Sequence, residues 1–203
     1  MAYYHDLITQ QSFAELIKLK QIVDFVLIGG WAVYFYTKSL KSKDIDILIN
    51  YDDLPRLASH YSLAKNERLK KYEARRAEIH IDVYVPYYSH LGIPVESLLK
   101  QTHNQEGFKL LEANYLTVLK MYTFSQRANS IKGRKDFLDI LALLRSDVVA
   151  LPKITELVSG YELMPAYKVF SSTLKVTTKI PELNLNQHQL AKLKKTVILQ
   201  SKT

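Results

Sequence analysis

The spacing of apolar residues predicts short β-strands in the first half of the chain. Residues 78–85 alternate between Ile or Val and polar side chains, which is typical of a strand with one buried face. The same alternation predicts a strand over residues 44–49, and an apolar run predicts a buried strand over residues 24–28. Residues 68–76 are basic, and we interpret them as an edge strand, where lysines discourage pairing with another chain.

Helical spacing replaces this alternation in the second half of the chain. Amphipathic spacing predicts an early helix over residues 6–20 and a second helix that begins after Gly30. The later helices are predicted over residues 113–127, 135–144, from 152, 161–180 and 186–199, with a polar loop over 129–134. The sequence therefore predicts an α/β (α+β) fold, with a small mixed sheet flanked by helices over residues 1–105 and a mainly helical domain over residues 106–203.

Two features between residues 25 and 49 indicate where chemistry takes place. The strand that ends at Ile28 is followed by Gly29-Gly30 and a helix, and backbone N–H groups in such a turn can face a phosphate. Asp44 and Asp46 stand two positions apart on the next strand, so both side chains project from the same face. Together the two features suggest a site that handles a nucleotide.

A third carboxylate, Asp82, points away from the apolar face of its strand. If this strand neighbours the one that carries Asp44 and Asp46, three like charges converge, and they stay ionised together only when cations neutralise them. Two Mg²⁺ (or Mn²⁺) ions would do so and would also hold a triphosphate. The competing interpretation is a solvated sheet face with scattered aspartates, which is a poor account of Asp-Ile-Asp beside a glycine turn.

These residues resemble the signature of the nucleotidyltransferase superfamily. That signature is a hydrophobic residue with Gly-Gly or Gly-Ser, a spacer, and then alternating acidic and hydrophobic residues. Residues 28–30 and 44–47 match it with thirteen residues between them, and Asp82 between Ile81 and Val83 is similar to the third carboxylate. The resemblance implies that Asp44, Asp46 and Asp82 are both the catalytic carboxylates and the metal ligands.

Residues 107–140 resemble the segment that follows the catalytic core in the AbiEii-like group, which includes toxins of toxin–antitoxin pairs. The group has a mid-helix lysine, an arginine and a Lys-Asp-x-x-Asp helix, and Lys120, Arg127 and residues 135–139 match them. The resemblance implies that Lys120 reaches the triphosphate. The chain departs from the group at Leu40, where many members have arginine, and at Gly30, where serine is common. The nucleotide-binding residues implied are Gly29, Gly30, Ser42, Lys43, Lys120, Lys135 and Asp136.

Charge adds a candidate partner to this interpretation. The formal net charge is +8, and it divides into +1 over residues 1–100 and +7 over residues 101–203. A basic half beside a nearly neutral half indicates a polyanion such as RNA, although a solvated lysine-rich surface explains it equally well. There are no cysteines, which excludes disulfides and thiolate metal sites. No apolar run is long enough to span a bilayer and no signal peptide is recognised, so we expect a cytoplasmic protein without membrane partners.

The function expected from the residues and the resemblance is metal-dependent transfer of a nucleoside monophosphate from an NTP to an acceptor hydroxyl. RNA, and tRNA in particular, is the favoured acceptor, and the resemblance implies a toxin role with an antitoxin protein as a partner. Two alternatives stay open. One is a catalytically silent nucleotide- or RNA-binding module with the same fold. The other is a small-molecule nucleotidyltransferase, against which the basic second half argues.

Overall fold

The computed structural model describes residues 2–76 and 78–200, and it divides the chain into two compact units. The first unit, Met1–Glu112, contains a β-sheet, and the second unit, Ala113–Thr203, is helical. This mixed arrangement confirms the predicted α/β fold class. In the part of the chain that the structure describes, no helix is both long and apolar enough to cross a membrane.

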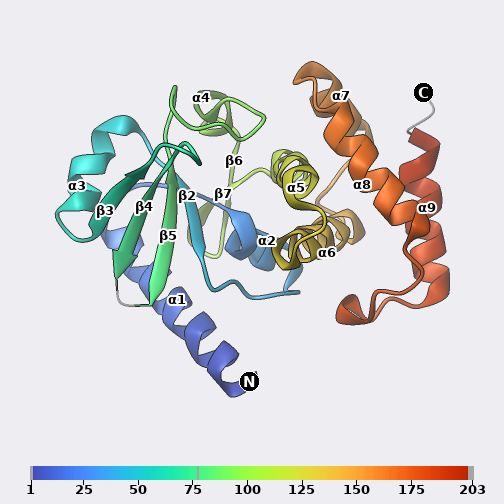
Figure 1. Ribbon diagram of the computed structural model, residues 1–203, viewed down its shortest axis with the longest axis horizontal. Helices are drawn as coiled ribbons and strands as arrows, with labels where there is room; N and C mark the ends of the chain where they lie inside the picture. Colours follow the sequence, from blue (N-terminus) through green and yellow to red (C-terminus); the bar gives the residue numbers. More distant parts are fainter. Residues whose placement is uncertain (1, 77, 201–203) are drawn as a thin grey trace. The chain divides into compact units, whose positions relative to one another are not determined.

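The sheet unit is built on a mixed sheet in which seven strands take the order β3-β4-β5-β2-β1-β7-β6 (Figure 1). Their bounds are β1 Val26–Ile28, β2 Ile45–Leu48, β3 Ser62–Asn66, β4 Lys71–Arg76, β5 Ile79–Tyr84, β6 Thr102–Gln105 and β7 Phe108–Leu111. β2 runs parallel to β5 and β1 runs parallel to β7, whereas the other neighbouring pairs are antiparallel. The predicted strands over residues 24–28, 44–49 and 78–85 therefore form the centre of the sheet.

The interpretation of residues 68–76 as an edge strand is wrong. This segment becomes β4, which pairs with β3 on one side and with β5 on the other. The edge is β3, a strand of mostly exposed or half-buried residues that carries no apolar alternation from which it could be predicted. The basic side chains of β4 therefore do not protect an edge, and at least one of them serves another purpose.

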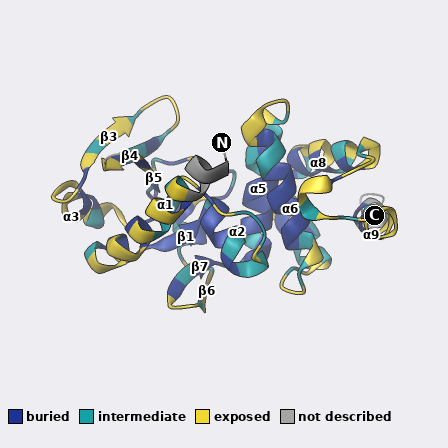
Figure 2. Ribbon diagram, turned by 90° about the horizontal axis from the view of Figure 1, so that it is seen from below, coloured by how far each residue is buried: buried dark blue, intermediate teal, exposed yellow. Residues whose placement is uncertain are grey.

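Helices α1 (Ala2–Ile22) and α2 (Gly29–Thr37) pack on the sheet and on each other. The indole N–H of Trp31 donates to the hydroxyl of Ser12 at 2.9 Å, and the rings of Phe13 and Trp31 lie 5.2 Å apart. Trp31 is 2% exposed, so it anchors α2 in the core. Figure 2 shows that the outer side of α1 is exposed, as expected of an amphipathic helix. The shorter elements of this unit are η1 (Tyr51–Asp53), α3 (Leu54–Ala58) and α4 (Val95–Leu98).

The helical unit is organised around α5 (Ala113–Arg127), which packs against α6 (Ile131–Arg145), α7 (Leu151–Gly160) and α8 (Met164–Val176). η2 (Pro181–Leu183) and α9 (Gln187–Gln200) complete this unit. The core contains a run of aromatic rings in contact, from Phe124 to Phe137 to Phe170. Figure 2 shows α5 and α6 as largely buried ribbons.

α6 begins four residues earlier than predicted, within the segment interpreted as a polar loop. The hydroxyl of Ser130 accepts from the backbone N–H of Gly133 at 2.9 Å and so caps the helix. A Cβ on Gly133 would lie 2.1 Å from the carbonyl oxygen of Arg127, so this first turn needs glycine. The polar composition of residues 129–134 therefore reflects a helix cap rather than an open loop.

Candidate active site

The glycine turn and the first strand carboxylates meet directly. Gly29 has φ +65°, a left-handed conformation that favours glycine, and a Cβ added there would lie 2.0 Å from Asp46 Oδ2. The register explains the contact, because Ile28 at the end of β1 pairs with Asp46 on β2. The two sequence features that suggested a nucleotide site are therefore one structural feature, in which the turn is packed against a carboxylate.

The same turn begins α2, whose first residue is Gly29. The N-cap residue is Ile28, whose apolar side chain cannot accept a hydrogen bond from the first N–H groups of the helix. The first N–H groups of a helix have no acceptor within it, and the positive end of the helix dipole favours anions nearby. The turn can thus place backbone donors and a carboxylate side by side, as a bound phosphate with a cation would require.

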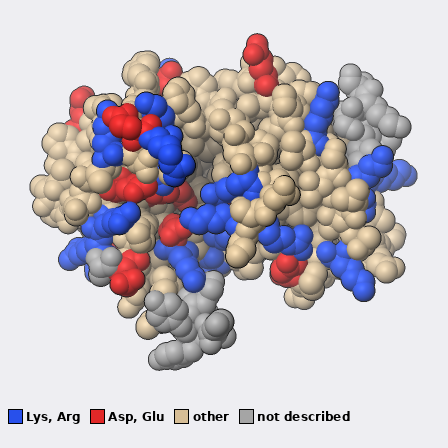
Figure 3. Space-filling view, in the orientation of Figure 1, with Lys and Arg blue, Asp and Glu red and all other residues tan. Residues whose placement is uncertain are grey.

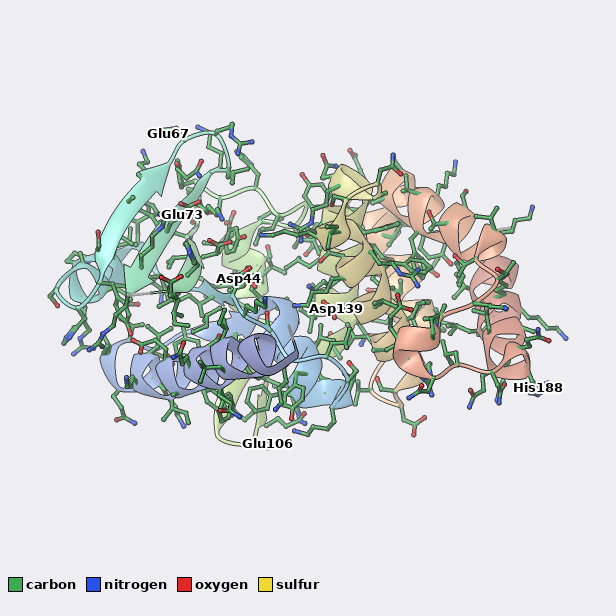
Figure 4. All side chains as sticks on the ribbon, turned by 60° about the horizontal axis from the view of Figure 1, so that its bottom comes forward. Asp44, Glu67, Glu73, Glu106, Asp139 and His188 are labelled. Carbon is green, nitrogen blue, oxygen red and sulfur yellow. The ribbon has the colours of Figure 1, made fainter. Side chains whose placement is uncertain are left out.

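Three carboxylates occupy one cross-strand row on this sheet. Asp46 on β2 is in register with Asp82 on the parallel strand β5, so the two strands are neighbours. Asp82 is in turn opposite Glu73 on β4. Asp44 precedes β2 by one residue and is half-buried. Figure 4 labels Asp44 and Glu73, and Figure 3 shows acidic side chains on this unit with Lys and Arg side chains on either side of them.

Glu73 was missed from the sequence because β4 was interpreted by its charge alone. Its carboxylate accepts from Asn66 Nδ2 at 2.9 Å and from Arg75 at 3.3 Å. The hydrogen bond from Asn66, followed by the ammonium of Lys71, lowers the pKa of Glu73 below its ordinary value. The alternation of charged residues at positions 71, 73 and 75 was the available signal, since such residues share one face of a strand.

Lys71 is the second residue that the sequence did not identify. Its side chain is only 11% exposed, and its Nζ lies 2.6 Å from Asp82 Oδ2 and 3.4 Å from Glu73 Oε1. A buried ammonium is unfavourable unless it is paired, and two carboxylates pair it here. Asp82, predicted as a metal ligand, therefore already has a cation in contact with one of its oxygens.

The arrangement of the three predicted aspartates bears on where a divalent cation could bind, and their role as metal ligands stays a prediction. Within residues 2–76 and 78–200, no group of three or more His, Asp or Glu side chains is placed to hold a metal ion. Asp44 and Asp46 carry the carboxylate oxygens that Mg²⁺ prefers, and the Asp46 carboxylate packs so closely on Gly29 that a Cβ there would lie 2.0 Å from its Oδ2. Asp82 instead directs an oxygen to Lys71.

The other predicted residues of the sheet unit lie in α2 and in the segment before β2. Gly30 is buried in the first turn of α2. Ser42 is buried and Lys43 is exposed, and both precede Asp44 in the segment that leads into β2. Their contact with a nucleotide stays a prediction.

The structure brings Lys120 and Asp136 together inside the helical unit. Lys120 Nζ lies 3.2 Å from Asp136 and 2.8 Å from Asp139, and Arg127 Nε donates to Asp136 at 2.7 Å. Lys120 is 8% exposed, and both aspartates are 1% exposed or less. Lys120 and the two aspartates thus form a buried ionic cluster between α5 and α6, and Arg127, whose side chain is 39% exposed, balances its charge from the surface. Figure 4 labels Asp139. Lys135 is half-buried in the first turns of α6. The proposed reach of Lys120 to a triphosphate stays a prediction.

Asp139 depends on Lys120 for its charge balance. Neither of its carboxylate oxygens has a hydrogen-bond partner of good geometry among the described residues, although Lys120 Nζ is 2.8 Å away. We regard this as a true ion pair, because the separation is short and the carboxylate is fully buried.

Three solved structures are similar to this chain at low sequence identity. The Megavirus polyadenylate synthase is 16% identical with a TM-score of 0.44, and the match covers 70% of this chain and 32% of that protein. An antigenic nucleotidyltransferase-like protein from Paracoccidioides brasiliensis is 17% identical with a TM-score of 0.42, over 89% of this chain and 98% of the other. JHP933 from Helicobacter pylori is 16% identical with a TM-score of 0.46, and the match covers 95% of this chain and 92% of that protein.

This chain therefore spans about a third of the length of the polyadenylate synthase that it resembles. No protein-family model matches the sequence, and no curated protein matches it either. We base the function on the residues of the site itself.

Proposed function

We propose that this protein is a metal-dependent nucleotidyltransferase that moves a nucleoside monophosphate from an NTP to an acceptor hydroxyl and releases pyrophosphate. The contact between Gly29 and Asp46 carries the proposal. A glycine turn before a helix is a kind of turn that can bind phosphate, and here it packs against a carboxylate two positions from Asp44. A solvated sheet face with scattered aspartates would not require a glycine packed against one of them.

Each residue then has a stated task. Asp44 and Asp46 would hold a Mg²⁺ or Mn²⁺ ion, which when bound supplies charge neutralisation for the phosphates and the leaving pyrophosphate. The backbone donors at Gly29 and Gly30 orient the phosphates, with Ser42 and Lys43 beside the approach to β2. Asp82 would help to activate the acceptor hydroxyl. Lys120, Lys135 and Asp136 are assigned to the nucleotide by the resemblance alone.

The acceptor and the biological role are also proposals. The +7 charge of residues 101–203 favours a polyanionic acceptor, and we favour RNA, including tRNA. A toxin role with an antitoxin partner follows from the AbiEii-like resemblance, and a cytoplasmic location would give access to NTP and RNA.

The test is a label-transfer assay with total RNA, Mg²⁺ and each of the four NTPs labelled at the α-phosphate. Transfer to RNA should be lost in Asp46→Asn and kept in Asp24→Asn, a matched change at an exposed aspartate that pairs with Lys109 at 2.6 Å. Loss of transfer only in Asp46→Asn supports the enzyme. Absence of transfer to any acceptor, with NTP binding retained in Asp46→Asn, would favour the silent binding module.

A further inference from the structure

The structure places a buried cation against a carboxylate that the sequence assigned to a metal. Lys71 is the first residue of β4, directly after the turn of the β3–β4 hairpin. Its neighbour across that hairpin is Asn66, whose side chain also accepts from the backbone N–H of Leu69 at 2.9 Å. The position of Lys71 is therefore fixed by the hairpin backbone and not only by its own flexible side chain.

We propose that Lys71 is a positioning residue that occupies the cation position on Asp82, so that its ammonium and a divalent cation compete for this carboxylate. The inference rests on the proposed function, because it concerns the same row of carboxylates. It assigns Asp44 and Asp46 as the firm site for a divalent cation. Asp82 becomes a position that a second divalent cation can take only by displacing Lys71.

The exposure and the second partner of Lys71 favour competition with a divalent cation over a purely structural ion pair. The side chain of Asp82 is 23% exposed and that of Lys71 is 11% exposed, so the aspartate is the more accessible of the two to a cation from solvent. Lys71 is also shared with Glu73 at 3.4 Å. If a divalent cation draws Asp82 away, Lys71 keeps a carboxylate partner and is not left buried and unpaired.

The pairing also explains how the carboxylate row is stable in the protein before any divalent cation binds. Asp46, Asp82 and Glu73 occupy neighbouring register positions on three adjacent strands. Like charges on directly opposite residues destabilise a sheet. Lys71 neutralises one carboxylate of the row, and Asn66 and Arg75 stabilise the charge of Glu73.

The decisive experiment measures Mn²⁺ binding by calorimetry in the wild type, Lys71→Met, Lys71→Arg and Lys65→Met. Lys65 is the matched control, since it lies on β3 in the same hairpin and pairs with Glu67 at 2.7 Å. Removal of the ammonium should strengthen Mn²⁺ binding about tenfold, because an adjacent like charge disfavours a bound cation. Lys71→Arg and Lys65→Met should retain wild-type affinity. Unchanged or weaker binding in Lys71→Met would overturn the inference.

Thermal unfolding gives a readout that a structural role alone would not move. Lys71→Met should unfold at a lower temperature in EDTA and recover when Mn²⁺ is added, whereas the wild type should respond less. Recovery by Mn²⁺ is specific to a carboxylate row that needs a cation. A Lys71→Met protein that is equally destabilised with and without Mn²⁺ contradicts the proposed competition.

A second variant keeps the inference testable if Lys71→Met does not fold. Asp82→Asn leaves Lys71 with Glu73, and it should weaken Mn²⁺ binding by no more than about tenfold, because the row loses one negative charge but Lys71 already occupies Asp82 in the wild type. A loss of more than tenfold would show that Asp82 is an open metal ligand and would refute the inference. Failure of the proposed function is a separate result, because Asp46→Asn would then bind Mn²⁺ like the wild type and RNA labelling would be absent throughout.

Discussion

Gly29→Ala tests the contact on which the site depends. A Cβ at this position would lie 2.0 Å from Asp46 Oδ2 and 2.7 Å from Asp46 Cβ, whereas ordinary contacts begin at 3.4 Å. Rotation of the Asp46 side chain can move its carboxylate, but it cannot move its Cβ, which is fixed to the backbone of β2. The β1 and β2 backbones must therefore shift, and β2 carries both Asp46 and, just before it, Asp44.

The size of the effect follows from two costs. A non-glycine residue in the left-handed region costs roughly 1 kcal/mol, and overpacking adds about 1–3 kcal/mol. The total of about 2–4 kcal/mol lowers Tm by roughly 4–16 °C for a chain of this size. A shift of about 1 Å at a reacting group costs about 100-fold in rate, so RNA labelling should fall by about that factor in the fraction that remains folded.

The control is Gly160→Ala, because a Cβ on Gly160 meets no atom within 4 Å. This change at the last residue of α7 should leave both Tm and labelling unchanged or slightly improved. Tm is measured by calorimetry, and label transfer is measured below the Tm of the variant. If Gly29→Ala keeps the wild-type Tm and the wild-type rate, Gly29 does not pack on Asp46 and the site is built differently.

Two further predictions concern buried titratable groups. Lys120→Met leaves Asp139 buried without a cation, and it should lower the free energy of unfolding, measured in urea, by about 3–5 kcal/mol. The double variant Lys120→Met with Asp139→Asn should recover part of this stability. An unchanged free energy of unfolding in Lys120→Met would contradict the buried ion pair. Burial, and then the hydrogen bond to Glu15, raises the pKa of Tyr61 above its ordinary value, so the folded protein keeps a proton that the unfolded chain releases. The stability from Tyr61 is thus complete below about pH 10 and is lost as the pH rises through the raised pKa. In Tyr61→Phe, Tm should fall less steeply with pH above about pH 10 than in the wild type. At neutral pH the same variant should lose about 1 kcal/mol of unfolding free energy, because the hydrogen bond to Glu15 is gone. An equally steep fall of Tm in both proteins would contradict the raised pKa of Tyr61.

Local periodicity was enough to find the central strands and the residues that they present. Residues 79–85 alternate so regularly that the buried and polar faces of β5 follow from backbone geometry alone. Gly29-Gly30 and Asp44-Ile45-Asp46 were recognisable for the same reason, since a turn and a two-residue alternation are local. β3 was not found because its residues neither alternate nor bury a face. The start of α6 was missed because cap residues have the composition of a loop.

The sequence by itself identified the residues at the centre of the sheet that are predicted to carry the chemistry: Gly29, Asp44, Asp46 and Asp82. The tertiary structure decided which of them meet, because strand order depends on non-local pairing that no local pattern encodes. It set β5 parallel to β2, which brings Asp82 into register with Asp46. It also placed β4 inside the sheet, where a lysine that looked like edge protection becomes the buried partner of Asp82. A charged side chain can be read from the chain, but the carboxylate that it neutralises is fixed only when the strands pair.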